Sequence, residues 1–321
     1  MPVIIPIASG KGGVGKTLTA IHSAITLAQL GKTTILIDSD MGGSNAHTYL
    51  GIKNRNPGIG SIIHRQESHI EDLILETRIP KLFLIPGDGQ LTGTANPPFW
   101  IRRRLEKEIN QLVCDYVVID LGAGTGTFIL DMFLLSRQGI VVTTPEIPAL
   151  LNAYGFIKST AIRIFQQHTK NKSPEGKIAN EMPTQNIDSS NGIGLDGWIE
   201  RIRKENPEAA SAILEDLKLY SPQILLNMGT HQKDLSLGSN IQRTCQKHLG
   251  IDARYIGFIP WFVEMRNLIN QQKLLTDEAN QSPIHRAFLR LGHQLLEMDH
   301  TGANRPPVLT EDDLVDGLFE E

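Results

Sequence analysis

The sequence predicts an α/β fold, in which a mostly parallel, twisted sheet carries helices on both faces. Seven short apolar runs alternate with segments of helical spacing, which is the order expected for parallel strands joined by crossover helices. Several of these runs, such as 34–37 and 117–119, are apolar on both faces, as in strands covered by helices on each side. A glycine-rich loop separates the first run from the first helical segment.

The predicted strands follow one another along most of the chain. They cover residues 3–9, 33–38, 81–86, 116–120, 139–144, 223–227 and 255–259. The first helix is expected at 16–30, where Leu18, Ile21 and Ile25 recur at roughly helical spacing. Because ligands of such sheets gather at the carboxyl ends of the strands, the residues that follow each run form the candidate site.

We expect one domain over residues 1–297, which includes a polar excursion and an extra helical segment, followed by a tail. Residues 171–194 are polar and predict a mobile excursion between two sheet elements. Residues 195–219 predict a helical segment in two pieces, with Pro207 suited to a first helical turn. The acidic tail 298–321 is expected to be disordered alone, and apolar residues near its end could form one side of a short helix that a protein groove captures.

Composition excludes several classes of protein. The chain has 321 residues, of which 40% are hydrophobic and 21% charged, as in an ordinary globular protein. A net charge of −4 disfavours a protein that holds nucleic acid by overall charge. Because the sequence shows neither a leader nor an apolar run long enough to span a bilayer, we expect a cytoplasmic location. Only Cys114 and Cys245 are present, which excludes a disulfide framework and a cysteine-rich metal site within one chain.

A phosphate-binding loop is the most specific motif. Residues 10–17, Gly-Lys-Gly-Gly-Val-Gly-Lys-Thr, fit the pattern G-x-x-x-x-G-K-[ST] between a predicted strand and a predicted helix. Glycines let backbone N–H groups close around phosphate oxygens, and the helix adds its positive N-terminal end. Lys16 is placed to neutralise the β- and γ-phosphates, and the Thr17 hydroxyl to ligate Mg²⁺. Lys11 lies too early in the loop for the role of Lys16, so its charge needs another task.

Carboxylates follow two of the predicted strands. Asp38 and Asp40 lie at the end of the second strand, and Asp120 at the end of the fourth. Phosphoryl transfer to water needs Mg²⁺ to offset the developing charge and a polar group to orient the attacking water. We assign Asp40 to the water, and Asp40 and Asp120 to the Mg²⁺ site through bridging water; Asp38 could act in either network or cap a loop. The glycines that begin at Gly122 suit a loop that moves when the γ-phosphate leaves.

The motifs together resemble the MinD/ParA class of P-loop ATPases, whose deviant Walker A motif has an early lysine as its signature, here Lys11. Residues 38–51, which include Asn45, are similar to switch I of the MinD and FlhG (FleN) branch. Asn227 resembles the asparagine that reads adenine, and Pro260 the loop that packs against that base. The likeness spans about residues 1–297.

The resemblance implies that ATP and Mg²⁺ are bound. The implied nucleotide-binding residues are Gly10, Lys11, Gly12, Gly13, Val14, Gly15, Lys16, Thr17, Leu18, Asn227 and Pro260, with Asp38, Asn45 and Gly122 as further candidates. Lys11, Lys16 and Asp40 would be catalytic. The family's ATP-bound homodimer implies that Lys11 crosses to the partner's phosphates like an arginine finger, so that one protomer alone hydrolyses ATP slowly. The implied role is a spatial or regulatory switch for an assembly of the cell division, flagellar number or partitioning type, acting on an unidentified protein partner.

Two departures and three alternatives accompany this interpretation. The tail lacks the basic amphipathic helix by which MinD binds membrane, and Leu18 stands where a second threonine is frequent. A ParA-type action on nonspecific DNA would need the basic clusters at 102–107 and 201–204, although such clusters are more often solvated helix faces. An iron–sulfur scaffold would need paired cysteines at a dimer axis. A non-hydrolysing nucleotide-binding module would release no phosphate.

Overall fold

The fold was analysed in a computed structural model of the chain. The structure describes residues 1–40, 43–53, 57–63, 69–87, 97–183, 194–271, 273, 275 and 282–298. The segment 299–321, which holds nearly all of the predicted acidic tail, lies outside the described residues.

An eight-stranded sheet forms the centre of the molecule, in the order β3-β4-β2-β5-β1-β6-β7-β8. The strands are β1 (Val3–Ser9), β2 (Thr34–Ser39), β3 (Leu75–Glu76), β4 (Leu82–Ile85), β5 (Tyr116–Ala123), β6 (Ile140–Thr143), β7 (Gln223–Gly229) and β8 (Arg254–Pro260). Each pair of neighbours is parallel except β3 and β4, which are antiparallel. The predicted fold class is therefore confirmed, and each of the seven predicted runs overlaps a strand. The edge strand β3 was not predicted, because two residues carry no recognisable period.

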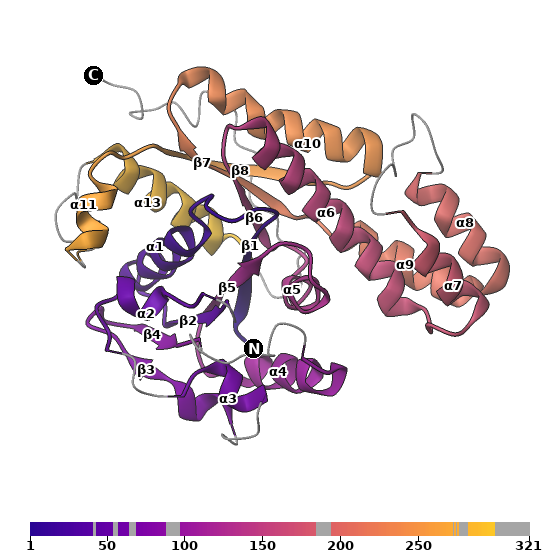
Figure 1. The fold of residues 1–321 in the computed structure, drawn as a ribbon, viewed down its shortest axis with the longest axis horizontal. Coiled ribbons are helices and arrows are strands. Elements are labelled where there is room, and N and C mark those ends of the chain that lie inside the picture. Colours follow the sequence, from indigo (N-terminus) through magenta and orange to yellow (C-terminus); the bar gives the residue numbers. More distant parts are fainter. Residues whose placement is uncertain are drawn as a thin grey trace.

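Helices cover both faces of this sheet, as Figure 1 shows. They are α1 (Lys16–Gln29), α2 (Ala46–Tyr49), α3 (Ile59–Ile63), α4 (Phe99–Gln111), α5 (Thr127–Phe133), α6 (Ile147–His168), α7 (Pro174–Glu181), α8 (Leu195–Glu205), α9 (Pro207–Leu219), α10 (Leu235–Leu249), α11 (Met265–Asn270) and α13 (Pro283–Leu296). Helices α1 and α13 contact each other and one group of strands, while α5, α6 and α10 pack together on the other side. Two short 3₁₀ turns lie at Ile70–Leu73 and Gln232–Asp234.

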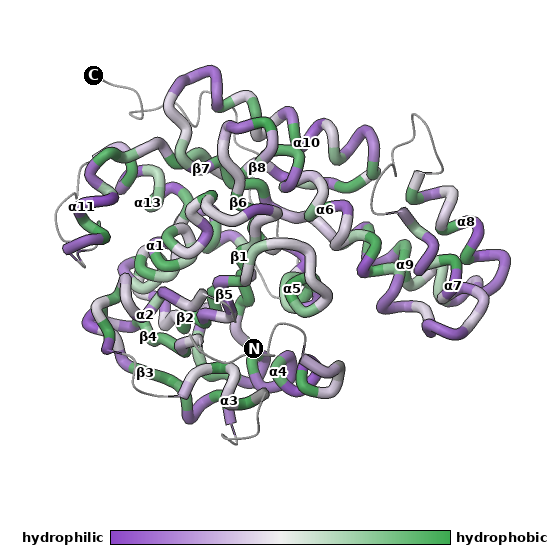
Figure 2. Tube along the Cα trace, in the orientation of Figure 1, coloured by the Kyte–Doolittle hydropathy of each residue, from purple (hydrophilic) through white to green (hydrophobic). Residues whose placement is uncertain are grey.

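The core lies between the sheet and these two helical layers. All seven residues of β1 are buried, and so are all six of β2, because both strands lie inside the sheet. Figure 2 shows hydrophobic residues along the central strands and hydrophilic ones on the outer turns of the helices. Burial of both faces explains why these strands are continuous apolar runs rather than alternating ones.

Three helices form a smaller group beside α6. Residues 174–181, inside the segment expected to be an excursion, form α7, and residues 195–219 form α8 and α9. Asn206 caps α9 by accepting a hydrogen bond from the backbone of Ala209, and Pro207 lies in the first turn of that helix. None of the helices that the structure describes combines the length and hydropathy needed to cross a bilayer.

Candidate functional site

The phosphate-binding loop lies between the end of β1 and the start of α1. Gly13 and Gly15 have φ angles of 83° and 82°, in the left-handed region that glycine adopts without steric cost. A Cβ at Gly15 would lie 2.2 Å from Nδ2 of Asn227, and a Cβ at Gly10 would lie 2.1 Å from the carbonyl oxygen of Asn152 on α6. Close packing therefore requires glycine at positions 10 and 15, and the bend of the loop requires it at positions 13 and 15.

A buried ion pair lies beneath this loop. Nζ of Lys16 is 2.6 Å from Oδ1 of Asp120, and the two side chains are 8% and 1% exposed. Burial raises the pKa of the Asp120 carboxyl, while the Lys16 charge and hydrogen bonds from Lys16 and Thr17 oppose the rise. Three of the residues predicted from the sequence therefore meet at the carboxyl ends of β1 and β5.

Asp38 holds the segment that follows β2. Its Oδ1 accepts a hydrogen bond from the backbone N–H of Asp40 at 3.2 Å, and its Oδ2 accepts one from the N–H of Ala46 at 3.0 Å. The side chain is fully buried, and burial, with the nearby Asp120 charge second, raises the pKa of Asp38 to about 7. The loop-capping alternative for Asp38 thus has a direct structural basis, and its carboxylate also lies close enough to Asp120 to affect it.

Asp40 lies at the rim of the same edge. A Cβ built on Gly122 would be 3.7 Å from Oδ1 of Asp40, so this carboxylate faces the glycine loop that follows β5. Asn45 is more peripheral, because its Nδ2 donates to the carbonyl of Gly43 at 2.6 Å in an exposed turn. Residues 41 and 42 lie outside the described residues.

Asn227 reaches the loop from the other side. Its Nδ2 donates to the backbone carbonyl of Val14 at 2.8 Å, and the residue is 7% exposed. The next residue, Met228, has a φ of 59°, an uncommon conformation for a residue with a side chain. Pro260 is buried at the end of β8, opposite Gly229 of β7. The hydrogen bond from Asn227 to the loop, like the close approach of Asn152 to Gly10, has no signal in the sequence spacing.

Lys11 differs from Lys16 in its surroundings. The residue is exposed, and its backbone carbonyl accepts a hydrogen bond from Oγ of Ser9 at 2.9 Å. Among the residues that the structure describes, Lys11 has no ion pair, whereas Lys16 is buried against Asp120. The two lysines of one short loop therefore face different environments.

Comparison with known proteins assigns the fold and loop to a family. Residues 5–285 match the CobQ/CobB/MinD/ParA nucleotide-binding domain. The chain belongs to this family. Its sequence is 33% identical over 151 residues to the septum site-determining protein MinD of Synechocystis, covering 47% of this chain and 56% of that protein. It is 31% identical over 180 residues to the flagellum site-determining protein YlxH of Helicobacter pylori, covering 55% and 57% of the two chains.

The solved structures agree with the fold. The septum site-determining protein MinD of Pyrococcus horikoshii, complexed with Mg-ADP, has a TM-score of 0.61 and 18% identity and covers 92% of this chain and 96% of its own. The sequence matches to the Synechocystis and Helicobacter pylori proteins cover little more than half the length of each of those proteins.

The residues at the carboxyl ends of β1, β2 and β5 fit a nucleotide and a divalent cation. Oδ2 of Asp120 is buried and accepts no hydrogen bond from any residue that the structure describes. Asp38 and Asp120 are both buried carboxyls with raised pKa values, which is an arrangement that a cation stabilises. A Cβ at Gly12 or Gly13 would meet no atom within 4 Å, so the backbone at these residues is open to a ligand.

Most of the basic side chains considered for DNA contact are paired within the chain. Arg102 bonds Asp131, Arg103 lies 3.1 Å from Glu106, and Arg104 lies 2.7 Å from Glu108. In α8, Arg201 lies 3.8 Å from Glu181 and Arg203 bonds Glu200. These pairs reduce the positive charge that either cluster offers to a phosphate backbone.

Proposed function

We propose that the protein is an ATP-binding, Mg²⁺-dependent ATPase that dimerises on ATP and acts as a spatial or regulatory switch for a macromolecular assembly. The observation that carries the proposal is the loop itself, in which a buried Lys16 pairs with Asp120 while Lys11 projects from an exposed position. Membership of a nucleotide-binding family supports the choice of ligand.

In this proposal Lys16 changes partner when the nucleotide binds. Its ammonium group neutralises Asp120 in the structure, and it would turn to the β- and γ-phosphates in the complex. The Thr17 hydroxyl, with Asp120 and Asp40 through water, would hold Mg²⁺, which offsets the charge that develops on the phosphoryl group. Asp40, at the rim and beside Gly122, would orient the attacking water.

Lys11 is proposed to act on the second protomer. Its exposure leaves the side chain available to a neighbouring molecule, and a cation delivered to the phosphates in trans raises turnover by orders of magnitude. Exposed apolar side chains on the same edge support a surface that a second copy covers. Ile147 and Leu151 are 72% and 65% exposed at the start of α6, whose Asn152 lies against Gly10.

The test compares Lys11→Ala with wild type in ATP turnover and in ATP-driven dimerisation, measured by light scattering after size exclusion. For wild type we expect the rate of ATP turnover to increase more than linearly with protein concentration, because the dimer is the active form. In Lys11→Ala we expect this turnover to be lost with little change in thermal stability. Lys107→Ala serves as a matched control, because it removes an exposed lysine on α4. Unchanged turnover in Lys11→Ala would refute the role.

The partner is proposed to be a protein of an assembly positioned in the cell, because the curated relatives carry septum and flagellum site-determining names. Asp40→Ala should bind ATP and remain dimeric, since it removes the group that positions water but leaves the loop intact. A pull-down with this variant should enrich proteins that wild type releases. Identical profiles for the two proteins would argue against a nucleotide switch.

A further inference from the structure

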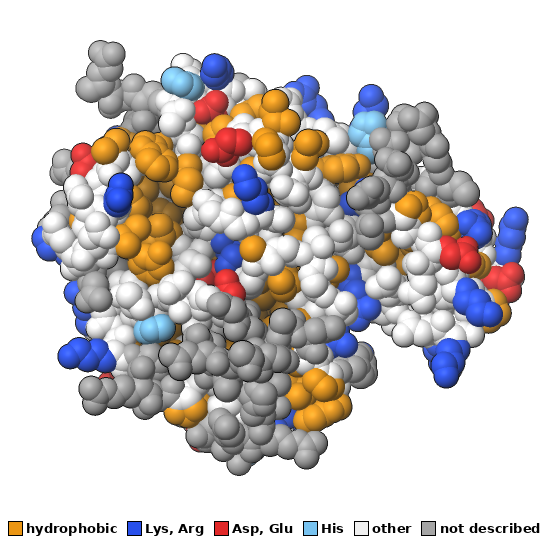
Figure 3. All heavy atoms as spheres, viewed as in Figure 1, with side chains coloured by type: hydrophobic (Ala, Val, Ile, Leu, Met, Phe, Trp, Pro, Cys, Tyr) orange, Lys and Arg blue, Asp and Glu red, His pale blue; other side chains and the backbone are white. Residues whose placement is uncertain are grey.

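A cavity lies away from the nucleotide edge, between α4, α5, α6 and the α7–α9 group. It encloses about 870 Å³, which lies within the range of small-molecule sites. Figure 3 shows a hollow at this position with Lys and Arg side chains along its walls. Its lining is mainly polar and includes Arg102, Arg103, Arg137, Arg163, His168 and Gln167.

The arginines of this cavity outnumber its carboxylates. Four arginines share the cavity with Glu106, Asp131 and Asp216, which leaves a net charge of +1 from these side chains. Several of the charges are only partly accessible, because Asp131 is 13% exposed and Arg163 is 16% exposed. A positive excess inside a hollow attracts anions more strongly than the same charge on an open surface.

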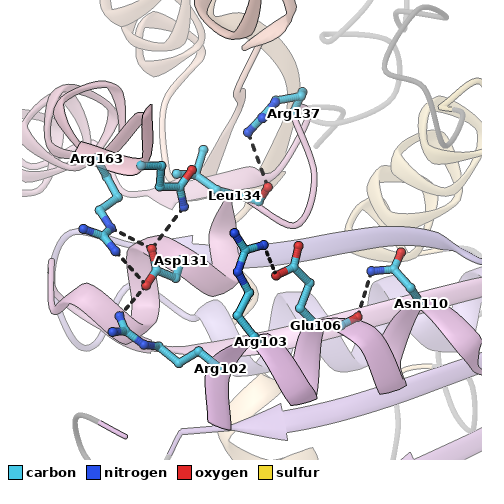
Figure 4. Close-up of polar contacts among 9 residues, drawn as sticks. Arg102, Arg103, Glu106, Asn110, Asp131, Leu134, Arg137 and Arg163 are labelled. Atoms are coloured by element: carbon cyan, nitrogen blue, oxygen red, sulfur yellow. Dashed lines mark hydrogen bonds and ion pairs between the residues drawn. The ribbon is translucent and has the colours of Figure 1, made fainter. Parts of the chain in front are cut away.

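Asp131 orients two of these arginines at once. Its Oδ1 accepts from Nε of Arg163 at 2.6 Å and from Nε2 of Gln167 at 3.1 Å, while its Oδ2 accepts from Nη2 of Arg163 at 3.1 Å and also from Arg102. Figure 4 shows the guanidinium groups of α4 and α6 converging on this carboxylate of α5. One carboxylate therefore fixes two cations, and their rotamers are held before any ligand arrives.

Asp216 fixes the opposite wall in the same manner. Its Oδ2 accepts from Nη2 of Arg137 at 2.7 Å and lies 2.7 Å from Nε2 of His168. Arg103 lies at the rim, with its side chain 65% exposed, and pairs with Glu106 on its own helix. A guanidinium group has five donors, so an arginine already bonded to a carboxylate keeps N–H groups for a second anion.

We propose that this cavity binds a small phosphate ester. Arginine forks match phosphate oxygens bidentately, and a tetrahedral phosphate presents three terminal oxygens to donors that come from different helices. The side chains of Thr127 and Asn171 add neutral donors to the lining. A hollow of this volume favours a small ligand over a nucleic acid, which needs an extended stripe of basic residues. The loop that precedes α5 joins this cavity to the nucleotide edge, because Thr127 follows Gly126 directly.

The test is calorimetric titration of the full chain with glycerol 3-phosphate. The protein is first saturated with Mg-ADP, so that the phosphate-binding loop is filled. Saturable binding is expected, and Arg103→Gln and Arg137→Gln should each weaken it by about 5–10-fold, as loss of one charge-assisted contact at a partly exposed site predicts. Glu106→Gln should tighten it by about 3-fold, because it adds to the positive excess.

Arg203→Gln is the matched control for Arg103→Gln, since it removes an exposed arginine that pairs with an acid three residues away on α8. It should leave affinity unchanged. The proposal would be overturned if glycerol 3-phosphate did not bind to the Mg-ADP complex of the protein. It would also be overturned if Arg203→Gln lost as much affinity as Arg103→Gln, or if Glu106→Gln bound the ligand more weakly than wild type. Succinate, a dianion of similar size, binding as tightly as the phosphate ester would overturn the assignment to phosphate. None of these outcomes depends on ATP turnover, so this proposal and the proposed function fail independently.

Discussion

Replacing Lys16 by Met should cost the protein stability as well as nucleotide binding. The substitution removes the ammonium group that lies 2.6 Å from Asp120, and Asp120 is 1% exposed. An uncompensated buried carboxylate destabilises a fold by about 3–5 kcal/mol, and the fully buried Asp38 nearby adds repulsion of the same sign. We therefore expect Lys16→Met to lower the free energy of unfolding by about 3–5 kcal/mol at pH 7.5, in the absence of nucleotide and Mg²⁺.

A double-mutant cycle separates this electrostatic cost from loss of packing. In Lys16→Met/Asp120→Asn the buried charge is gone, so about 2 kcal/mol of the loss should be recovered relative to Lys16→Met alone. Urea denaturation followed by circular dichroism measures all four proteins, and equal m-values show that the transitions are comparable. If Asp120→Asn destabilises both backgrounds equally, the two side chains are not coupled and the reasoning is wrong.

Gly15 and His22 provide two further tests of packing and burial. Gly15→Ala should lower the free energy of unfolding by about 1–3 kcal/mol, because it places a Cβ 2.2 Å from Nδ2 of Asn227 at a φ of 82°. Gly12→Ala, where a Cβ meets no atom within 4 Å, should not lower it. Scanning calorimetry of the nucleotide-free proteins measures both variants, and equal losses would contradict the packing argument. Burial, aided by His285, lowers the pKa of His22 to about 4, so the unfolded chain binds more protons than the folded one between pH 6.5 and 4. The free energy of unfolding therefore falls as the pH is lowered through that window. Between pH 7.5 and pH 5 the free energy of unfolding, measured by urea denaturation, should fall by about 2 kcal/mol more in wild type than in His22→Gln. An equal fall in the two proteins would refute the assignment.

The sheet and the phosphate loop were predictable because their signals are local. The buried strands are continuous apolar runs, and the loop places Gly10, Lys16 and Thr17 within eight residues. The meeting of Lys16 with Asp120 also follows from the rule that parallel strands end at one edge. Helix α7 could not be predicted in this way, since it contains few apolar residues and therefore shows no clear helical period.

Long-range contacts account for the rest of what the sequence could not predict. The hydrogen bond from Asn227 to Val14 joins residues 213 positions apart, and the hypothetical contact of Gly10 with Asn152 depends on how α6 crosses the loop. The arginine cavity collects side chains from separate helices, among them Arg102, Arg163 and Asp216. No spacing rule links such residues, and in the sequence Arg102 belongs only to a short basic run.

A complementation experiment tests most directly whether catalysis belongs to a dimer. Lys11→Ala lacks the lysine that is proposed to cross to the partner, and Asp40→Ala lacks the group that is proposed to position water in its own site. A heterodimer of the two has one complete site, because the Lys11→Ala protomer keeps Asp40 and receives Lys11 from its partner. An equal mixture of the two inactive variants should therefore recover up to about a quarter of wild-type ATP turnover. A mixture no more active than the sum of its separate components would contradict the account.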